Sequence, residues 1–378
     1  RRQPTSPRIC TRGLKTSSRS ARAQPVGGFT PGGREYVTVL GKGQCTPVPW
    51  INVVANQEFG FQVSESGSGY TWSVNSRENK LTPWSNDPVS DSPGEAFFGR
   101  DEDSNLVWGP TLLPIREEPW PYVIRHGQGY SRFEHTSHGI ALDLLQLVPV
   151  RDSVKISRLT LENRSKGKRR LSVTAYAEWV LGVARGDSAP FVVTEIDPAT
   201  GAMLARNAWN GEFAGRVAFA DLGGRQTSFT GDRLEFLGRN ACLEHPASLE
   251  RGRKLSGKTG AGLDPCAALQ EMVELEPGER TEVVFVLGQG DSLVDARSLV
   301  ERYREMDGGA ALLEVDVLEA LPGLHVQRID LEDRVELLHH LGLQAVAQED
   351  LALGQQAGDL RLALHVGRDG AATGRLRL

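Results

Sequence analysis

The chain has 378 residues, a net charge of -5 and 24% charged residues, so a nucleic-acid-binding protein is not expected. No run of about eighteen apolar residues would span a membrane. The four cysteines form no C-x-x-C pair, which argues against a zinc site or a disulfide framework and favours a reducing, cytoplasmic compartment.

The N-terminal segment, residues 1–26, is basic. Residues 1–24 hold seven Arg or Lys, no acid, and many Ser and Thr. An organellar transit peptide has this composition in outline, and a basic nucleic-acid arm would look similar. A disordered or non-native start explains it more simply, and we assign 1–26 as such a tail.

From residue 27 to 290 the sequence is that of a β-protein rich in turns, with 42 glycines and 20 prolines in the whole chain. Alternating, β-branched or aromatic segments predict strands at 34–40, 58–64, 70–74, 97–98, 106–108, 122–126, 130–135, 140–148, 154–161, 171–180, 191–196, 203–206, 216–220, 234–237, 272–275 and 281–287. No βαβ rhythm appears, so the prediction is a mainly β fold with a large antiparallel β-sandwich.

The period changes after residue 291. Ser292 and Asp295 resemble a capping box, and Leu293, Ala296 and Val300 recur at helical spacing. We predict a helix over 292–305 within a linker segment 291–312. Its apolar stripe is expected to be exposed in this chain and to promote self-association.

The last segment, 313–378, is assigned as a poorly determined tail. Residues 316–378 contain no Phe, Tyr or Trp, which leaves weak means to build a core. Both ends of the chain differ abruptly in composition from the middle. A gene fragment read partly out of frame would account for both ends.

The densest group of candidate functional residues lies between positions 47 and 139. Five of the seven Trp occur from Trp50 to Trp120. Trp rings stack on sugar faces, while Asn, Arg, Asp and His side chains bind hydroxyl groups, so this mixture fits a sugar-binding surface. The competing interpretation, that the Trp residues fill a large core, is the more frequent case.

The segments 27–29 (GGF), 33–37 (GREYV), 76–79 (SREN) and 82–88 (TPWSNDP) resemble the phosphorylase portion of cyclic β-1,2-glucan synthases. So do 107–110 (VWGP) and 125–130 (RHGQGY), although Gly109 stands where Ser is expected. That portion is similar to cellobiose and chitobiose phosphorylases, the family called glycosyltransferase 36 or glycoside hydrolase family 94. The resemblance covers about residues 27–312 and is specific over 27–150.

The resemblance implies a galactose-mutarotase-like supersandwich over 27–290, followed by a linker helix, an (α/α)-barrel and a small β-domain. The family's general acid is an aspartate in the barrel within a Trp-Asn-Asp type motif. Residues 209–211 (WNG) lack the aspartate. The chain is therefore expected to be truncated before the catalytic barrel and inactive alone.

The family reaction implied is phosphorolysis with inversion, with inorganic phosphate as co-substrate and no cofactor. The expected partners are a β-glucan oligosaccharide, the missing barrel and a second copy in a homodimer, with no nucleic acid. Cyclic glucan synthases themselves are inner-membrane proteins.

No catalytic residue is expected in the chain. The candidate substrate-binding residues are Arg77, Asn79, Trp84, Arg125 and His126. The first three lie in an apparent loop, where functional residues concentrate. A structural role for His126, bonded to backbone, remains an equal alternative.

A metal site is disfavoured, because Glu134 and His135 would lie on opposite faces of one strand, although His138 is near. Two other functions stay open. One is a stand-alone mutarotase that uses His126 or His135 as acid and Glu178 as base. The other is a purely structural or dimerisation module.

Overall fold

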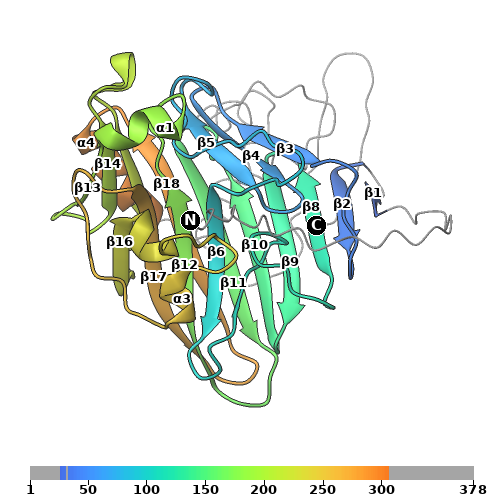
Figure 1. Ribbon diagram of the computed structural model, residues 1–378. Helices are drawn as coiled ribbons and strands as arrows, with labels where there is room; N and C mark the ends of the chain where they lie inside the picture. The colour runs from blue at the N-terminus through green and yellow to red at the C-terminus, as the bar shows by residue number, and fades with distance from the viewer. Residues whose placement is uncertain (1–25, 31–32, 306–378) are drawn as a thin grey trace, which may run out of the picture.

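The computed structural model describes residues 26–30 and 33–305 (Figure 1). The predicted tail 313–378 and residues 1–25 lie outside them. The first layer is a ten-stranded antiparallel sheet. Across the sheet its strands are β1 (Gly27–Phe29), β2 (Glu35–Leu40), β8 (Tyr122–Gly127), β9 (Tyr130–Ser137), β10 (Ile140–Leu147), β11 (Val154–Asn163), β18 (Arg280–Gly290), β15 (Val217–Asp221), β14 (Met203–Asn207) and β13 (Val192–Ile196).

Two smaller antiparallel sheets share a hydrophobic core with the first layer. The five-stranded sheet has the order β16 (Ser228–Asp232), β17 (Pro265–Leu275), β12 (Arg169–Glu178), β6 (Glu95–Asp101) and β7 (Val107–Trp108). The three-stranded sheet contains β3 (Ile51–Ala55), β4 (Phe59–Ser64) and β5 (Gly69–Ser73). The predicted mainly β sandwich is confirmed, whereas β1, β3 and β16 were not predicted.

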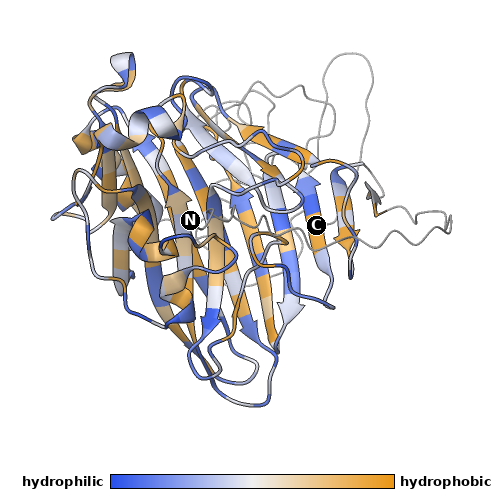
Figure 2. Cartoon of the chain, viewed as in Figure 1, coloured by the Kyte–Doolittle hydropathy of each residue, from blue (hydrophilic) through white to orange (hydrophobic). Residues whose placement is uncertain are grey.

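Alternation along the strands builds this core (Figure 2). In β12, Leu171, Val173 and Ala175 are buried in the main core, as their spacing predicted. The opposite face of β12 is also covered, because Tyr176 stacks on Phe236 with ring centroids 4.9 Å apart. The five-stranded sheet is therefore buried on both faces over much of its area.

The cover on that outer face is helical. It consists of α2 (Arg233–Leu237) and α3 (Ala247–Glu250), which contribute Phe236, Leu237 and Leu249 to the apolar cluster around Tyr176. The other short helices of the described residues are α1 (Arg185–Ser188) and the 3₁₀ turns η1 (Ala189–Phe191) and η2 (Gly211–Phe213). The prediction of a strand at 234–237 is wrong. The Asp232 carboxylate accepts a hydrogen bond from the backbone N–H of Leu234 at 3.1 Å, and this N-cap starts α2 directly after β16.

The helix predicted at 292–305 is observed as α4 (Leu293–Glu305). Its predicted exposed stripe is wrong, because Ala296, Leu299 and Val300 are buried. They pack on an apolar patch on the outer face of the ten-stranded sheet that includes Phe219 and Val286. In the described part of the chain no helix is long and apolar enough to cross a membrane.

Candidate functional site

A cleft of about 590 Å³ opens at one end of the outer face of the five-stranded sheet. The last residue of β12, Glu178, pairs in register with Cys266 of β17 and lies at this end. The cleft walls come from the loop between β5 and β6, from the turn before α1, and from the α2–α3 connection. These segments, which are distant in sequence, meet near the end of β12 together with Leu113 and Pro114 of the β7–β8 connection.

Trp84 forms an aromatic wall of the cleft. Its ring stacks on Tyr70, with centroids 5.3 Å apart and planes at 12°. Tyr70 is buried, whereas Trp84 remains 44% exposed. A ring held from behind and open in front offers a flat apolar face, which suits a sugar ring.

The polar part of the cleft is an ion-paired group. Glu178 contacts Arg233 at 2.6 Å and Arg185 at 3.2 Å. Asp264 also pairs with both arginines. Two carboxylates balance two guanidinium groups, which leaves the group neutral overall and rigid.

The ion pairs of Glu178 with Arg185 and Arg233 determine which groups of the cleft can interact with a ligand. The Glu178 carboxylate also accepts a hydrogen bond from the Tyr176 hydroxyl at 3.0 Å, and its side chain is 9% exposed. A carboxylate held by two arginines is a poor proton donor or acceptor for a substrate. The guanidinium N–H groups of Arg185 and Arg233, by contrast, are hydrogen-bond donors suited to sugar hydroxyls.

The other two candidates from the same loop lie elsewhere. The Arg77 side chain is 82% exposed and pairs with Glu78 at 3.3 Å, outside the cleft. Asn79 is fully buried and donates hydrogen bonds to the backbone carbonyl of Ser73 at 3.0 Å and to Gln289 Oε1 at 2.7 Å. Asn79 therefore fixes the loop that carries Trp84 and is not accessible to a ligand.

Arg125 and His126 lie on β8 of the ten-stranded sheet and do not line the cleft. Arg125 pairs with Glu134 at 3.0 Å and with Glu35 at 3.4 Å. His126 Nδ1 is 3.0 Å from Ser131 Oγ. Burial lowers the pKa of His126 to about 4, against an opposing backbone contact from Trp50, so this imidazole is neutral at pH 7.

The structure does not assemble the other sites considered from the sequence. His135 stacks on Tyr122 at 3.9 Å, and His138 contacts Glu117 at 3.0 Å. Within residues 26–30 and 33–305 no group of three His, Cys, Asp or Glu is arranged to hold a metal. Glu178 is held by Arg185, Arg233 and Tyr176. His126 contacts Ser131 and His135 contacts the Pro121 carbonyl, so neither histidine is bonded to Glu178 as a mutarotase acid–base pair would suggest.

Sequence reasoning missed Arg185, Arg233 and Asp264. No local motif marks them, because they are separated by tens of residues and converge only through the pairing of β12 with β17 and the position of α2. Trp84 was found because an aromatic residue in a polar loop is itself a local signal.

Comparison with known proteins gives a consistent result. Residues 34–306 match the family model described as glycosyl hydrolase 94, supersandwich domain. The cyclic beta-(1,2)-glucan synthase NdvB of Rhizobium meliloti (strain 1021) is 41% identical over 286 residues, which is 76% of this chain and 10% of that protein. The N,N'-diacetylchitobiose phosphorylase of Vibrio proteolyticus is 25% identical over 287 residues, 74% of this chain and 35% of that protein.

Among solved structures, a bacterial glucoamylase complexed with acarbose matches 73% of this chain and 39% of its own, at 7% identity and a TM-score of 0.43. That score is too low to carry an argument. The chain thus spans only a minor part of the curated relatives it matches.

Proposed function

The chain belongs to the glycosyl hydrolase 94 supersandwich family, and from that premise we propose that it is the sugar-facing, non-catalytic domain of an enzyme that acts on β-linked glucans. The observation that carries the proposal is Trp84, half-exposed and stacked on Tyr70 at the wall of the cleft. The sugar ring lies on this face, and the arginines opposite bind its hydroxyl groups.

The substrate class follows from the relatives. The relative with 41% identity is named a cyclic beta-(1,2)-glucan synthase, whereas the phosphorylase of chitobiose is 25% identical. We therefore propose a β-1,2-linked glucan as the ligand. Inorganic phosphate is the proposed co-substrate of the whole enzyme, with no other cofactor.

Catalysis is assigned to the remainder of that larger protein. Glu178, which lines the cleft, and its neighbour Asp264 are both held by arginines, which supports a binding role for this group and not proton transfer. Glu244 is a further carboxylate in the cleft lining. A catalytic barrel is the proposed partner, and a second copy of the chain is a further proposed partner.

The test is a calorimetric titration of the full 378-residue chain with β-1,2-gluco-oligosaccharides, alongside an assay for glucose 1-phosphate release with added phosphate. We expect saturable binding and no release. Release by this chain alone would show that it carries the chemistry. Interconversion of anomers would support a mutarotase, and absence of any binding would leave a structural module.

A further inference from the structure

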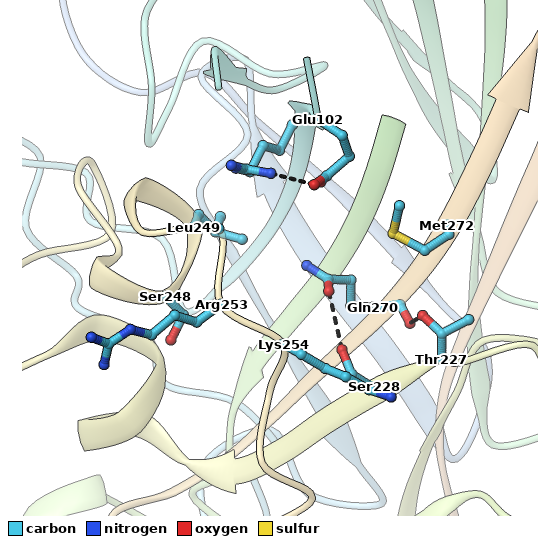
Figure 3. Close-up of a pocket in the computed structure, with 11 residues that line it drawn as sticks. Glu102, Thr227, Ser228, Ser248, Leu249, Arg253, Lys254, Gln270 and Met272 are labelled. Atoms are coloured by element: carbon cyan, nitrogen blue, oxygen red, sulfur yellow. Dashed lines mark hydrogen bonds and ion pairs between the residues drawn. The ribbon is translucent and has the colours of Figure 1, made fainter. Parts of the chain in front are cut away.

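A second cavity lies at the opposite end of the same outer sheet face. Beyond the cover over Tyr176, register brings Gln270 opposite Thr174 and Arg100 opposite Ser172. The cavity measures about 250 Å³ (Figure 3). Its lining is mostly polar and comprises Arg100, Glu102, Thr227, Ser228, Ser248 and Gln270, with Lys254 and Met272 at its side.

The cavity carries uncompensated positive charge. Arg100 and Glu102 form an ion pair and cancel one another. Arg253 and Lys254 also line the cavity, and neither has a carboxylate partner within the described part of the chain. An arginine and a lysine without counter-ions beside a cavity attract an anion.

A buried donor without a hydrogen-bond partner also belongs to a lining residue. The Arg100 side chain is 6% exposed, and its Nε has no hydrogen-bond partner among the described residues. The backbone of Gly252 covers this guanidinium at a φ of +57°, and an added Cβ would lie 2.4 Å from Arg100 Nη2. Glycine is therefore required for this close approach. A buried N–H without a partner is costly, so an oxygen ligand would be stabilised beside it.

Neutral polar groups complete the site. Ser228 Oγ donates to Gln270 Oε1 at 3.0 Å, and Gln270 Nε2 donates to Thr174 Oγ1 at 3.1 Å. The chain of bonds fixes both side chains while Ser228 Oγ keeps acceptor capacity for a hydroxyl group. In Figure 3, Lys254 extends toward Ser228, whereas Arg253 points away at the rim.

From these groups we propose that the cavity binds a small phosphate dianion, either free or carried by a monosaccharide, with Lys254 Nζ as its main charge partner. The uncompensated Lys254 ammonium is a charge partner for a phosphate group, Arg253 adds positive charge at the rim, and the hydroxyl and amide groups match a polyol. A volume of about 250 Å³ is below the range of about 300–1,000 Å³ typical of drug-sized ligands, which excludes an oligosaccharide. This site is separate from the Trp84 cleft.

The experiment is calorimetric titration of the full chain with inorganic phosphate and, separately, with glucose 6-phosphate at constant ionic strength. We expect saturable binding that Lys254→Ala weakens about tenfold, the loss of one charge-assisted contact. Arg251→Ala is the matched control, because Arg251 is an exposed cation on the same segment that does not line the cavity. An unchanged melting temperature without ligand verifies the fold of each variant.

If glucose 6-phosphate binds more tightly than inorganic phosphate, and Ser228→Ala weakens the binding of glucose 6-phosphate, the ligand is a sugar phosphate. Equal affinities assign free phosphate. The proposal is overturned if neither probe binds saturably, or if Arg251→Ala weakens binding as much as Lys254→Ala. Trp84→Ala should leave this binding unchanged, which separates this test from that of the sugar cleft.

Discussion

Glu271 illustrates how the fold perturbs a single residue. It lies on the same strand face as Leu269 and Val273 of β17, both in the main core, and so projects toward the inner face of the sheet. Burial raises the pKa of its carboxyl group to about 7, although Arg225 at 3.2 Å lowers it in part. The folded protein therefore holds this proton at a pH where the unfolded chain has released it.

The sign of the resulting pH dependence follows. The folded pKa of Glu271 lies above the ordinary value of 4.5, so its contribution to stability is fully present below about pH 4.5 and is lost as pH rises through about 7. We predict that Glu271→Gln becomes more stable than the wild type across this window, by up to about 3 kcal/mol. Urea unfolding at several pH values measures this difference.

Glu274→Gln is the control for this measurement. Glu274 is exposed on the same strand, and hydrogen bonding to Lys168 lowers the pKa of its carboxyl group. Its variant should show no gain in relative stability between pH 4.5 and 7. A Glu271→Gln curve parallel to that of the wild type would refute the assignment.

Two residues of the loop between β5 and β6 show which features of a site can be read from the sequence. Trp84 was a candidate from the sequence as a Trp in a polar loop, and it lines the cleft. Asn79 lies in the same loop and was a candidate for binding substrate, but its side chain is buried. Its burial depends on Gln289, which lies 210 positions away, and on Asn210. Such a partnership leaves no trace near Asn79.

At the level of elements, α4 is held to the sandwich by charge as well as by apolar contact. Three of its arginines pair with aspartates of the sandwich, one on β15, one after β13 and one between β10 and β11. The pairs are Arg297–Asp197, Arg302–Asp152 and Arg304–Asp221. Periodicity predicted the helix, but its docking surface is assembled from β10, β11, β14, β15 and β18, and only the folded sheet reveals that surface.

The apolar contact of α4 is testable by truncation. Leu299 is 5% exposed in the outer apolar patch, whereas Val294 of the same helix is 76% exposed. We predict that Leu299→Ala lowers the free energy of unfolding by about 2–4 kcal/mol, through lost burial and a cavity. Val294→Ala should change it by less than about 0.5 kcal/mol. Equal effects in the two variants would mean that α4 does not pack as described.

The Asp197–Arg297 pair should be visible in acid unfolding. Hydrogen bonds from Arg297 lower the pKa of Asp197 to about 2. A lowered folded pKa contributes stability that is present above about pH 3.8 and is lost as pH falls through about 2. Arg297→Ala should therefore shift the acid transition, followed by circular dichroism, to higher pH. A transition at unchanged pH would contradict this role.

At the scale of the whole molecule, one buried ion pair joins all three sheets. Lys155 of β11 donates to Glu95 of β6 at 2.8 Å and lies 4.2 Å from the centre of the Phe61 ring of β4. Glu95 also accepts from Thr71 of β5 at 2.6 Å. The side chains of Lys155 and Glu95 are 3% and 10% exposed. This contact fixes how the small sheets sit on the large one.

Breaking the pair should destabilise the entire sandwich. We predict that Lys155→Met costs about 3–5 kcal/mol, because it leaves the Glu95 carboxylate buried without its cation. The double variant Lys155→Met, Glu95→Gln should recover much of this loss, since the uncompensated charge is removed. A single variant as stable as the wild type in urea unfolding would contradict the interpretation.

The overall architecture was largely predictable, because alternation and turn residues are local. The binding role that we propose for this chain depends on the cleft, whose arginines converge only in the folded protein. The central claim is that the face of Trp84 opposite its contact with Tyr70 binds a sugar.

The most direct test is a parallel titration of the wild type, Trp84→Ala and Trp209→Ala with a β-1,2-gluco-oligosaccharide. Trp209 is the matched control, because it is 75% exposed and lies outside the cleft. We predict that Trp84→Ala weakens binding about tenfold or more, the loss of one stacking contact, and that Trp209→Ala leaves it unchanged. Equal binding by wild type and Trp84→Ala would contradict the assignment of the cleft as the sugar site.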